Sequence, residues 1–526
     1  MQKTKVVIIG GGFGGMFAAT NLLKLSRGDL DIELISKINY FVYQPLLPEV
    51  AAGTLNPQDA VTPLRNLLKG VQVRLAEVTD IDFDAKQVVL LQGQKKILQR
   101  LDYDHLVITT GQVANLSLFP GFEHHSLTMK DLSDAYRLRN RVIECMEMAD
   151  VTRFPDIKQR ALTFIVAGGG FSGVETMGEL AEMVDRILPE YPNIQRHEIR
   201  LVMIQLGSRI LPELPEHLSK YALDQLEKRG VEVWLNTGIH SATQQAVYTN
   251  DDRSLPTRTI VTTIGNGPSE FVKSLPIELQ RGRIAVSAEL EVVGLSNVWS
   301  IGDAALVPLN TDQKNSLYAP PTAQFAVAQA QVLAKNILRR TRGQSLEIFK
   351  YKAAGIMASL GGGRGVAEIY GRRVTGIPAW FMWRAAYIGM LPGLTAKVRV
   401  ALDWLLDLFM PRTIVYMAES DRPATRYLDY SKDEVVQQAN EVPAGFYIVL
   451  SGSLRQELER ADGEPERHEL RVGDSWGSRA LKEHRLTHGK ITAQEDTRLL
   501  LVNSGDFQRL RSSYAPFNAL LSAGNK

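Results

Sequence analysis

Cysteine is nearly missing from this chain of 526 residues, which has only Cys145. One thiol cannot form an intrachain disulfide, a Cys-x-x-Cys redox pair or a cysteine-ligated zinc or iron–sulfur site. An excess of charge of one sign is missing too, since 60 Lys and Arg face 58 Asp and Glu. Because positive and negative charges nearly cancel, the protein as a whole has no general attraction to nucleic acid. We therefore expect no thiol redox chemistry, no metal site and no nucleic-acid partner.

Long hydrophobic runs are also absent. No window reaches the roughly 18 to 20 apolar residues that a membrane-spanning helix needs. The N-terminus shows no signal peptide, because the apolar run at residues 5–9 leads directly into glycines. We predict a cytoplasmic protein whose membrane contact is peripheral. The most apolar stretch, residues 378–410, is interrupted by Arg384, Lys397, Arg399, Asp403 and Asp407.

Glycine, by contrast, is placed in two copies of one pattern about 158 residues apart. In each copy an apolar strand leads into G-x-G-x-x-G and then into a helical apolar pattern, with the glycines at Gly10, Gly12 and Gly15 and again at Gly168, Gly170 and Gly173. Such glycines allow a tight turn, close approach of a pyrophosphate and packing of helix on strand. Two bound dinucleotides are therefore expected.

Further sequence motifs lie between and after these turns. They are residues 101–111, read as a strand ending at Thr110 and Gly111, residues 297–305, which include Asp303, and the strings at 39–48, 171–180, 209–212 and 322–324. From about residue 4 to about residue 415, the combination resembles the type II NADH:quinone oxidoreductases, which belong to the two-dinucleotide-domain flavoproteins. The resemblance implies FAD on the first turn, NADH or NADPH on the second, and two-electron transfer to a quinone without proton pumping.

The expected fold is α/β with two Rossmann-like dinucleotide-binding domains. We predict an FAD domain from residues 1–115 and 266–345, an NAD(P)H domain from residues 116–265, an amphipathic segment at 346–418 and a small β-roll at 419–526. The resemblance implies a homodimer on the cytoplasmic face of the cell membrane, with the amphipathic segment providing either a membrane anchor or a dimer contact. In that segment Arg399, Asp403 and Asp407 form one narrow polar stripe.

The resemblance also assigns roles to residues near the cofactors. Asp303 contacts the ribityl chain of FAD, Glu175 lies near nicotinamide and flavin as a positioning or proton-relay carboxylate, and Gln324 holds the quinone headgroup. An alternative for Glu175 is a first-turn acid that only complements the helix dipole. The family's second glutamine, four positions after Gln324, is replaced by Ala328, and Gln329 lies about 100° away around the helix.

In neither dinucleotide-binding unit does the second strand end on the acidic residue that usually binds the ribose hydroxyls. The first ends on Ser36 and Lys37, and the second on Gln205, with Arg209 nearby. A neutral amide removes charge repulsion, and a guanidinium can pair with a 2′-phosphate. NADH and NADPH both remain open as electron donors.

The C-terminal region resembles cyclic nucleotide-binding domains, but the positions of the ribose-binding acid and the phosphate-binding arginine hold Ser478 and Thr487. We therefore expect a roll that does not bind a cyclic nucleotide. Two alternatives to the quinone reaction stay open. One is a soluble NAD(P)H diaphorase with another acceptor, and the other is a flavin redox sensor that signals through the roll.

Overall fold

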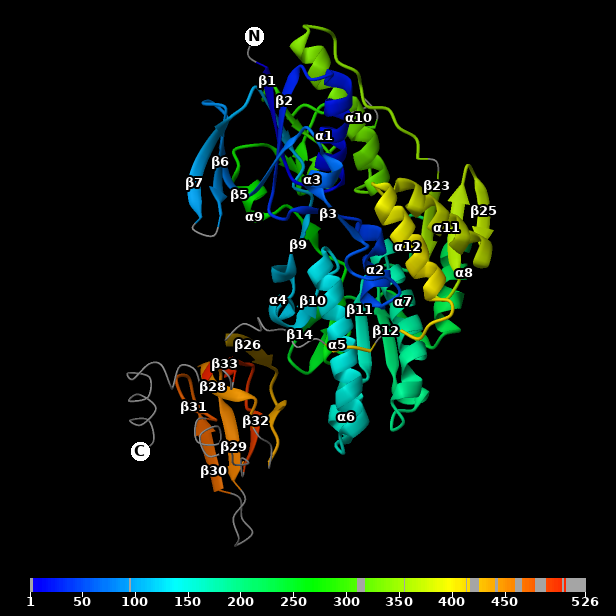
Figure 1. Cartoon of the computed structure of the whole chain (residues 1–526). Coiled ribbons are helices and arrows are strands. Elements are labelled where there is room, and N and C mark those ends of the chain that lie inside the picture. The colour runs from blue at the N-terminus through cyan, green and yellow to red at the C-terminus, as the bar shows by residue number, and fades with distance from the viewer. Residues whose placement is uncertain are drawn as a thin grey trace.

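Two largely parallel β-sheets, each with a glycine turn after one of its inner strands, form the body of the molecule, and a β-roll lies beside the second one (Figure 1). The computed structural model describes residues 3–93, 96–309, 317–353, 355–412, 414–416, 425–439, 443–458, 466–477, 489–503 and 506–507. The predicted fold class, two dinucleotide-binding α/β units followed by helices and a small β-domain, is confirmed.

The first sheet has seven strands in the order β21-β8-β1-β2-β5-β6-β7, of which the first five run parallel. Its central strand β1 is buried on both faces, as a parallel strand between helical layers must be. Helices α1 (Phe13–Ser26) and α10 (Ala323–Thr341) pack against each other on one side. The strands are Thr4–Ile9 (β1), Leu30–Ser36 (β2), Gln72–Asp82 (β5), Gln87–Gln92 (β6), Ile97–Asp102 (β7), His105–Ile108 (β8) and Val298–Ser300 (β21).

The single strand predicted across residues 101–111 is wrong. Strand β7 ends at Asp102, and β8 begins at His105 and pairs parallel with β1. The break arises because the Asp104 carboxylate accepts the Lys5 backbone N–H at 2.7 Å while the Asp104 N–H donates to the Lys5 carbonyl at 2.9 Å. These bonds turn the chain from the antiparallel hairpin into the parallel sheet.

The second sheet has five parallel strands in the order β10-β17-β11-β12-β13. Helices α5 (Leu132–Val151), α6 (Pro155–Ala161), α7 (Phe171–Ile187) and α8 (Glu216–Glu227) belong to this unit, which also carries the hairpin strands β14 (Ile239–Ala242), β15 (Ala246–Thr249) and β16 (Ser254–Pro256). The strands of the sheet are Ser126–Leu127 (β10), Thr163–Ala167 (β11), Arg200–Ile204 (β12), Val231–Trp234 (β13) and Thr259–Thr262 (β17).

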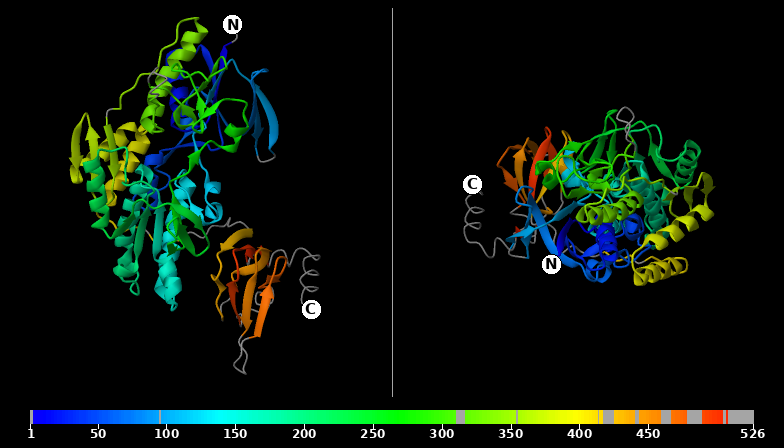
Figure 2. Two further views of the ribbon diagram at one scale, coloured as in Figure 1. Left: turned by 180° about the vertical axis from the view of Figure 1, so that it is seen from behind. Right: turned by 90° about the horizontal axis from the view of Figure 1, so that it is seen from above.

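A helical pair follows a small antiparallel sheet of β23 (Gly355–Ser359), β24 (Gly365–Ile369) and β25 (Arg372–Thr375). Its members are α11 (Ile377–Met390) and α12 (Leu394–Leu406). The pair lies on the far side of the body from the roll in all three views of Figures 1 and 2. Among the described residues, none of the helices has the length and apolar character needed to pass through a bilayer.

The roll consists of two four-stranded antiparallel sheets, ordered β26-β33-β28-β31 and β27-β32-β29-β30. Tyr447 stacks on Trp476 with ring centroids 4.6 Å apart, and the Trp476 indole N–H donates to Gln437. Ser478 and Thr487 lie outside the described residues. The strands are Thr425–Tyr430 (β26), Val435–Gln437 (β27), Gly445–Ser451 (β28), Leu454–Leu458 (β29), Glu466–Leu470 (β30), Ser475–Trp476 (β31), Gly489–Ala493 (β32) and Thr497–Asn503 (β33).

Candidate active site

The two glycine turns have the same construction. Gly10 and Gly168 adopt positive φ angles of 110° and 109°, which favour glycine. A Cβ on Gly15 would lie 1.9 Å from the Gly10 carbonyl oxygen, and a Cβ on Gly173 would lie 1.9 Å from that of Gly168. Glycine at these four positions is therefore required by the backbone itself.

The second glycine of each turn, Gly12 or Gly170, is explained by the space in front of it and not by the backbone. Gly12 and Gly170 are the N-caps of α1 and α7, and a Cβ built on either meets nothing within 4 Å. Neither helix has a side-chain cap or an acidic residue in its first turn. The free N–H groups and the positive helix end thus face open space, which suits a pyrophosphate. The residues present at both turns fit a dinucleotide.

A threonine closes each turn, and the sequence did not identify either one. The Thr109 hydroxyl donates to the Ile9 carbonyl at 2.8 Å and approaches that of Gly10 at 3.3 Å. Thr263 repeats the pattern at the second turn, with 2.9 Å to Ala167 and 3.4 Å to Gly168. Each threonine stands just after a strand that neighbours the glycine turn, so only the strand order brings it there.

The predicted FAD residues lie at the carboxyl end of the first sheet. Ser36 ends β2 and is buried beside the glycine turn, whereas Lys37 pairs with Glu77 at 2.8 Å. Thr110 has a buried hydroxyl without a hydrogen-bond partner among the described residues, and Gly111 follows it with φ 66°. An unsatisfied buried hydroxyl at this end of the sheet fits a ligand that supplies the missing bond.

Asp303 lies just after β21 in a basic environment. Burial raises the pKa of its carboxyl, and the charges of Lys130 and Arg283 oppose that rise. Burial lowers the pKa of Lys130, while Asp303 opposes this. Asp303 thus lies near two cations in a partly desolvated position. Its carboxylate oxygens can accept hydrogen bonds there from the hydroxyls of a ribityl chain.

Gln205 directly follows β12 and is held against the second glycine turn. Its side-chain oxygen accepts the Gly169 N–H at 2.8 Å, and its nitrogen donates to the Arg209 carbonyl at 3.3 Å. The Arg209 guanidinium donates to the Pro212 carbonyl at 2.6 Å. The amide therefore supports the turn, and no carboxylate stands at this position to repel a 2′-phosphate.

Glu175 lies in the second turn of α7 and is buried, 7% exposed. The alternative that it is a first-turn acid is therefore wrong. Its Oε1 accepts the indole N–H of Trp383 at 3.0 Å and the backbone N–H of Ser359 at 3.2 Å. Burial raises its pKa to about 8, although both hydrogen bonds lower it. At neutral pH this carboxyl is mostly protonated.

Two further glutamates surround Glu175, and sequence reasoning missed both. Glu49 on α2 (Leu47–Ala51) is 1% exposed and accepts the Trp404 indole N–H at 2.7 Å. Glu179 is 4% exposed and accepts the Thr54 hydroxyl at 3.3 Å. Burial raises the pKa of both carboxyls, and their mutual repulsion raises the pKa of Glu49 further.

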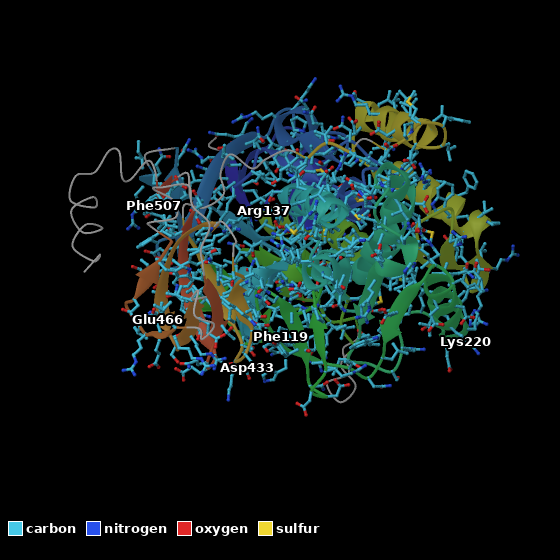
Figure 3. All side chains as sticks on the ribbon, turned by 90° about the horizontal axis from the view of Figure 1, so that it is seen from below. Phe119, Arg137, Lys220, Asp433, Glu466 and Phe507 are labelled. Carbon is cyan, nitrogen blue, oxygen red and sulfur yellow. The ribbon has the colours of Figure 1, made fainter. Side chains whose placement is uncertain are left out.

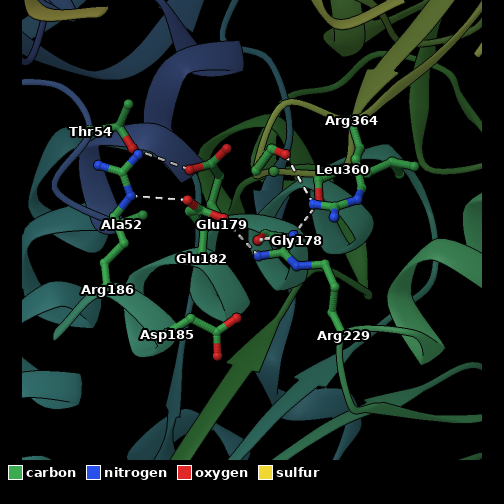
Figure 4. Close-up of polar contacts among 12 residues, drawn as sticks. Ala52, Thr54, Gly178, Glu179, Glu182, Asp185, Arg186, Arg229, Leu360 and Arg364 are labelled. Carbon is green, nitrogen blue, oxygen red and sulfur yellow. Dashed lines mark hydrogen bonds and ion pairs between the residues drawn. The ribbon is translucent and has the colours of Figure 1, made fainter. Parts of the chain in front are cut away.

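Arginine side chains fix this carboxyl cluster in place. Arg229 donates to the Gly178 carbonyl at 3.1 Å and to the Leu360 carbonyl at 2.8 Å, and it pairs with Glu182 at 3.1 Å (Figure 4). A Cβ on Gly178 would lie 2.4 Å from the Leu360 oxygen, so glycine permits this approach. The contact ties α7 to the end of β23 and holds Ser359 beside Glu175.

The two glutamines of α10 have separate tasks. Gln324, on the first turn, donates from Nε2 to the Gly355 carbonyl at 3.3 Å. Gln329 is buried, and its Oε1 accepts the Gly302 N–H at 2.7 Å, directly before Asp303. Gln329 therefore supports the turn at Asp303. It does not take the place of the family's second glutamine, whose position is occupied here by Ala328.

The polar stripe of α12 faces the protein. Arg399 pairs with Asp59 at 3.5 Å, and Asp403 accepts the Asn56 N–H at 3.0 Å. Many apolar side chains of the helical pair, and of residues 408–410 just after it, face outward, whereas Trp383, Val400 and Trp404 are buried. Those between 46% and 81% exposed are Ile377, Phe381, Leu394, Val398, Leu402, Leu405, Leu406, Leu408, Phe409 and Met410. An apolar patch of this extent marks a membrane or protein contact.

Comparison with known proteins agrees with this arrangement. The model of the pyridine nucleotide-disulphide oxidoreductase family matches residues 4–330, that of the NDH2 C-terminal domain residues 354–413, and that of the cyclic nucleotide-binding domain residues 427–514. Type II NADH:quinone oxidoreductase from Staphylococcus aureus is 31% identical over 388 residues, which cover 72% of this chain and 93% of that protein. The Staphylococcus haemolyticus enzyme is 30% identical over the same shares.

A solved structure supports the same fold. NDH2 from Plasmodium falciparum in complex with NADH superposes with a TM-score of 0.73 at 21% identity, covering 79% of this chain and all of that chain. The family resemblance predicted from the motifs is thus confirmed. The chain belongs to the type II NADH:quinone oxidoreductase family and carries an additional domain of the cyclic nucleotide-binding type.

Proposed function

We propose that this protein oxidises NADH with FAD at the first glycine turn and reduces a membrane quinone without pumping protons. When bound, FAD supplies a hydride acceptor and a two-electron donor. The observation that carries the proposal is the pair of equivalent glycine turns, one at Gly12 and one at Gly170, each with open space in front of an uncapped helix. Two turns of this kind fit two dinucleotides, and the comparison of family and fold points to FAD and NADH.

The chain's own residues would hold FAD at the carboxyl end of the first sheet. The N–H groups around Gly12 bind the pyrophosphate, Asp303 accepts ribityl hydroxyls, and Thr110 uses its unsatisfied hydroxyl. Ser36 and Lys37 border the adenosine end, where β2 finishes. These roles are what the family resemblance implies, and the positions and chemistry of the side chains are consistent with them.

The second turn would bind NADH and also NADPH. The amide of Gln205 carries no charge and is already bonded to Gly169 and Arg209. A 2′-phosphate therefore meets no carboxylate at the end of β12, and the Arg209 guanidinium is close by in the chain. We propose that both nucleotides are oxidised.

Quinone reduction requires one proton in addition to the hydride, because a hydroquinone carries two added hydrogens and the hydride brings one. We propose that Glu175 holds this proton. Its raised pKa keeps the carboxyl protonated at neutral pH, and Glu49 and Glu179 stand behind it to return a proton. Gln324, beside Gly355, is the proposed contact for the quinone headgroup.

The outward apolar face of α11 and α12 is the proposed membrane contact. Arg372 and Arg373 on β25 lie in the same region, as suits an interfacial anchor. Attachment to the cytoplasmic face and a homodimer remain predictions from the family resemblance. Flotation with vesicles tests membrane attachment, and sedimentation velocity in detergent tests the homodimer.

Anaerobic stopped-flow absorbance tests the reaction itself. We expect NADH to bleach the flavin absorbance and a short-chain quinone to restore it. Bleaching that ferricyanide reverses but quinone does not would favour the alternative of a diaphorase with another acceptor. A flavin that NADH does not bleach would contradict the whole proposal.

A further inference from the structure

The roll makes specific polar contacts with the nucleotide-binding unit of the second sheet. His125 on α4 (Phe122–His125) lies 3.2 Å from the Asp429 carboxylate of β26, and the Gln244 N–H donates to the Asp429 carbonyl at 3.0 Å. Glu434 accepts the hydroxyls of Thr243 at 2.9 Å and Tyr248 at 2.8 Å. These hydrogen bonds give the two parts a defined relative position.

Two adjoining cavities of about 380 and 390 Å³ lie in this junction. They share about half of their lining residues, and the same four arginines line both. Arg137 and Arg141 come from α5, Arg258 precedes β17, and Arg426 comes from β26 of the roll. Figure 3 shows Arg137 between the body and the roll.

The described walls are strongly basic. Glu123 is the only carboxylate among the lining residues of the first cavity, and Glu144 the only one in the second. Arg141 already approaches Glu144 at 3.4 Å and donates to the Arg258 carbonyl at 2.7 Å. Arginines that line a cavity from both sides make it favourable for an anion, since a guanidinium is always charged and can bind phosphate oxygens through parallel hydrogen bonds.

We propose that a small phosphate-bearing molecule binds in this junction and bridges the roll to the nucleotide-binding unit. Phosphate suits the site because its oxygens can accept from several arginines at once. The size of the cavity is that of a small-molecule site. The molecule is a soluble one, because the apolar face of α11 and α12 lies on the far side of the body, away from the junction (Figures 1 and 2).

This site extends beyond the roll, although Tyr430, Tyr447 and Leu501 of the roll also line the second cavity. It needs Arg258 and Arg141 from outside the roll, and the roll supplies Arg426 from its edge strand. The ligand would therefore stabilise the junction, because it binds only when both walls are in place. The proposal does not depend on the identity of the electron acceptor.

The test is isothermal titration of the FAD-loaded full-length protein with inorganic pyrophosphate and with ADP at constant ionic strength. We expect saturable binding, with a rise in Tm that grows with ligand concentration. Arg258→Gln and Arg426→Gln, one from each wall, should each weaken binding at least about tenfold. Arg471→Gln is the matched control, because this exposed arginine of the roll pairs with Glu469 and does not line the cavities.

Flavin content and NADH turnover of each variant verify that it is folded. Arg258→Lys keeps the charge but loses the planar fork, so it should bind with intermediate affinity. Failure of both probes to bind the native protein would overturn the proposal. Binding by Arg258→Gln and Arg426→Gln as tight as by the native protein would also overturn it, because the ligand would then lie elsewhere, such as inside the roll.

Discussion

The indole N–H of Trp383 donates to the Glu175 carboxyl over 3.0 Å, although the two residues are 208 positions apart in the chain. Trp404 does the same for Glu49 at 2.7 Å. The two tryptophans come from α11 and α12, the helices whose outer faces are apolar. The proposed membrane-contact helices thus also position the buried carboxyls of the quinone side.

Glu175 should give the quinone step its pH dependence. Its pKa is raised to about 8, so the carboxyl can donate a proton below that pH and loses this ability as the pH rises through it. We expect the rate of flavin reoxidation by quinone to fall above about pH 8. Glu175→Gln should be at least about tenfold slower and free of this transition, as stopped-flow measurements from pH 6 to about pH 10 would show.

Trp383→Phe provides a more subtle change at the same carboxyl. Loss of the indole donor removes an interaction that favours the charged form, so the pKa of Glu175 and the midpoint of the pH profile should move upward. Glu270→Gln, at a highly exposed carboxylate, is the control and should leave the profile unchanged. A midpoint that stays fixed in Trp383→Phe would rule out Glu175 as the titrating group.

The middle glycines allow the two nucleotide sites to be separated. Alanine fits the backbone at Gly12 and Gly170 without strain, and its methyl group would occupy the open space in front of the helix. Gly170→Ala should raise the KM for NADH about tenfold or more and keep FAD. Gly12→Ala should lose FAD during purification. Each variant is the control for the other, with flavin content and Tm measured for both.

Much of this site was visible in the sequence, but its long-range contacts were not. The glycine turns predicted both dinucleotide positions, because the spacing within each turn is local. Glu49 directly follows the string at residues 39–48 that carried the family resemblance, yet nothing in its neighbourhood signals burial. Its importance depends on Trp404, which is 355 positions away. The junction of the roll depends on tertiary packing in the same way.

Gln205→Glu tests the nucleotide preference. A carboxylate at the end of β12 should repel the 2′-phosphate of NADPH and can bind the ribose hydroxyls of NADH. We expect kcat/KM for NADPH to fall about tenfold, while the value for NADH stays within about threefold. Equal losses with both nucleotides would show that Gln205 only supports the turn at Gly169.

The apolar face of α12 should determine access to quinone in lipid. Leu405→Ser with Phe409→Ser removes two exposed apolar side chains, each contributing about 1.5–3 kcal/mol when buried. Co-sedimentation with vesicles should fall by more than about tenfold, and turnover with a water-soluble quinone should remain. Val472→Ser, on the roll, is the control, because Val472 is 63% exposed but lies outside the patch.

The most direct measurement of the central claim is anaerobic double-mixing stopped-flow of the native protein, with NADH first and a short-chain quinone second. The account predicts fast loss of flavin absorbance with NADH and fast recovery with quinone. It also predicts that Glu175→Gln slows only the recovery. Normal reduction by NADH without recovery in the presence of quinone would contradict the proposed reaction.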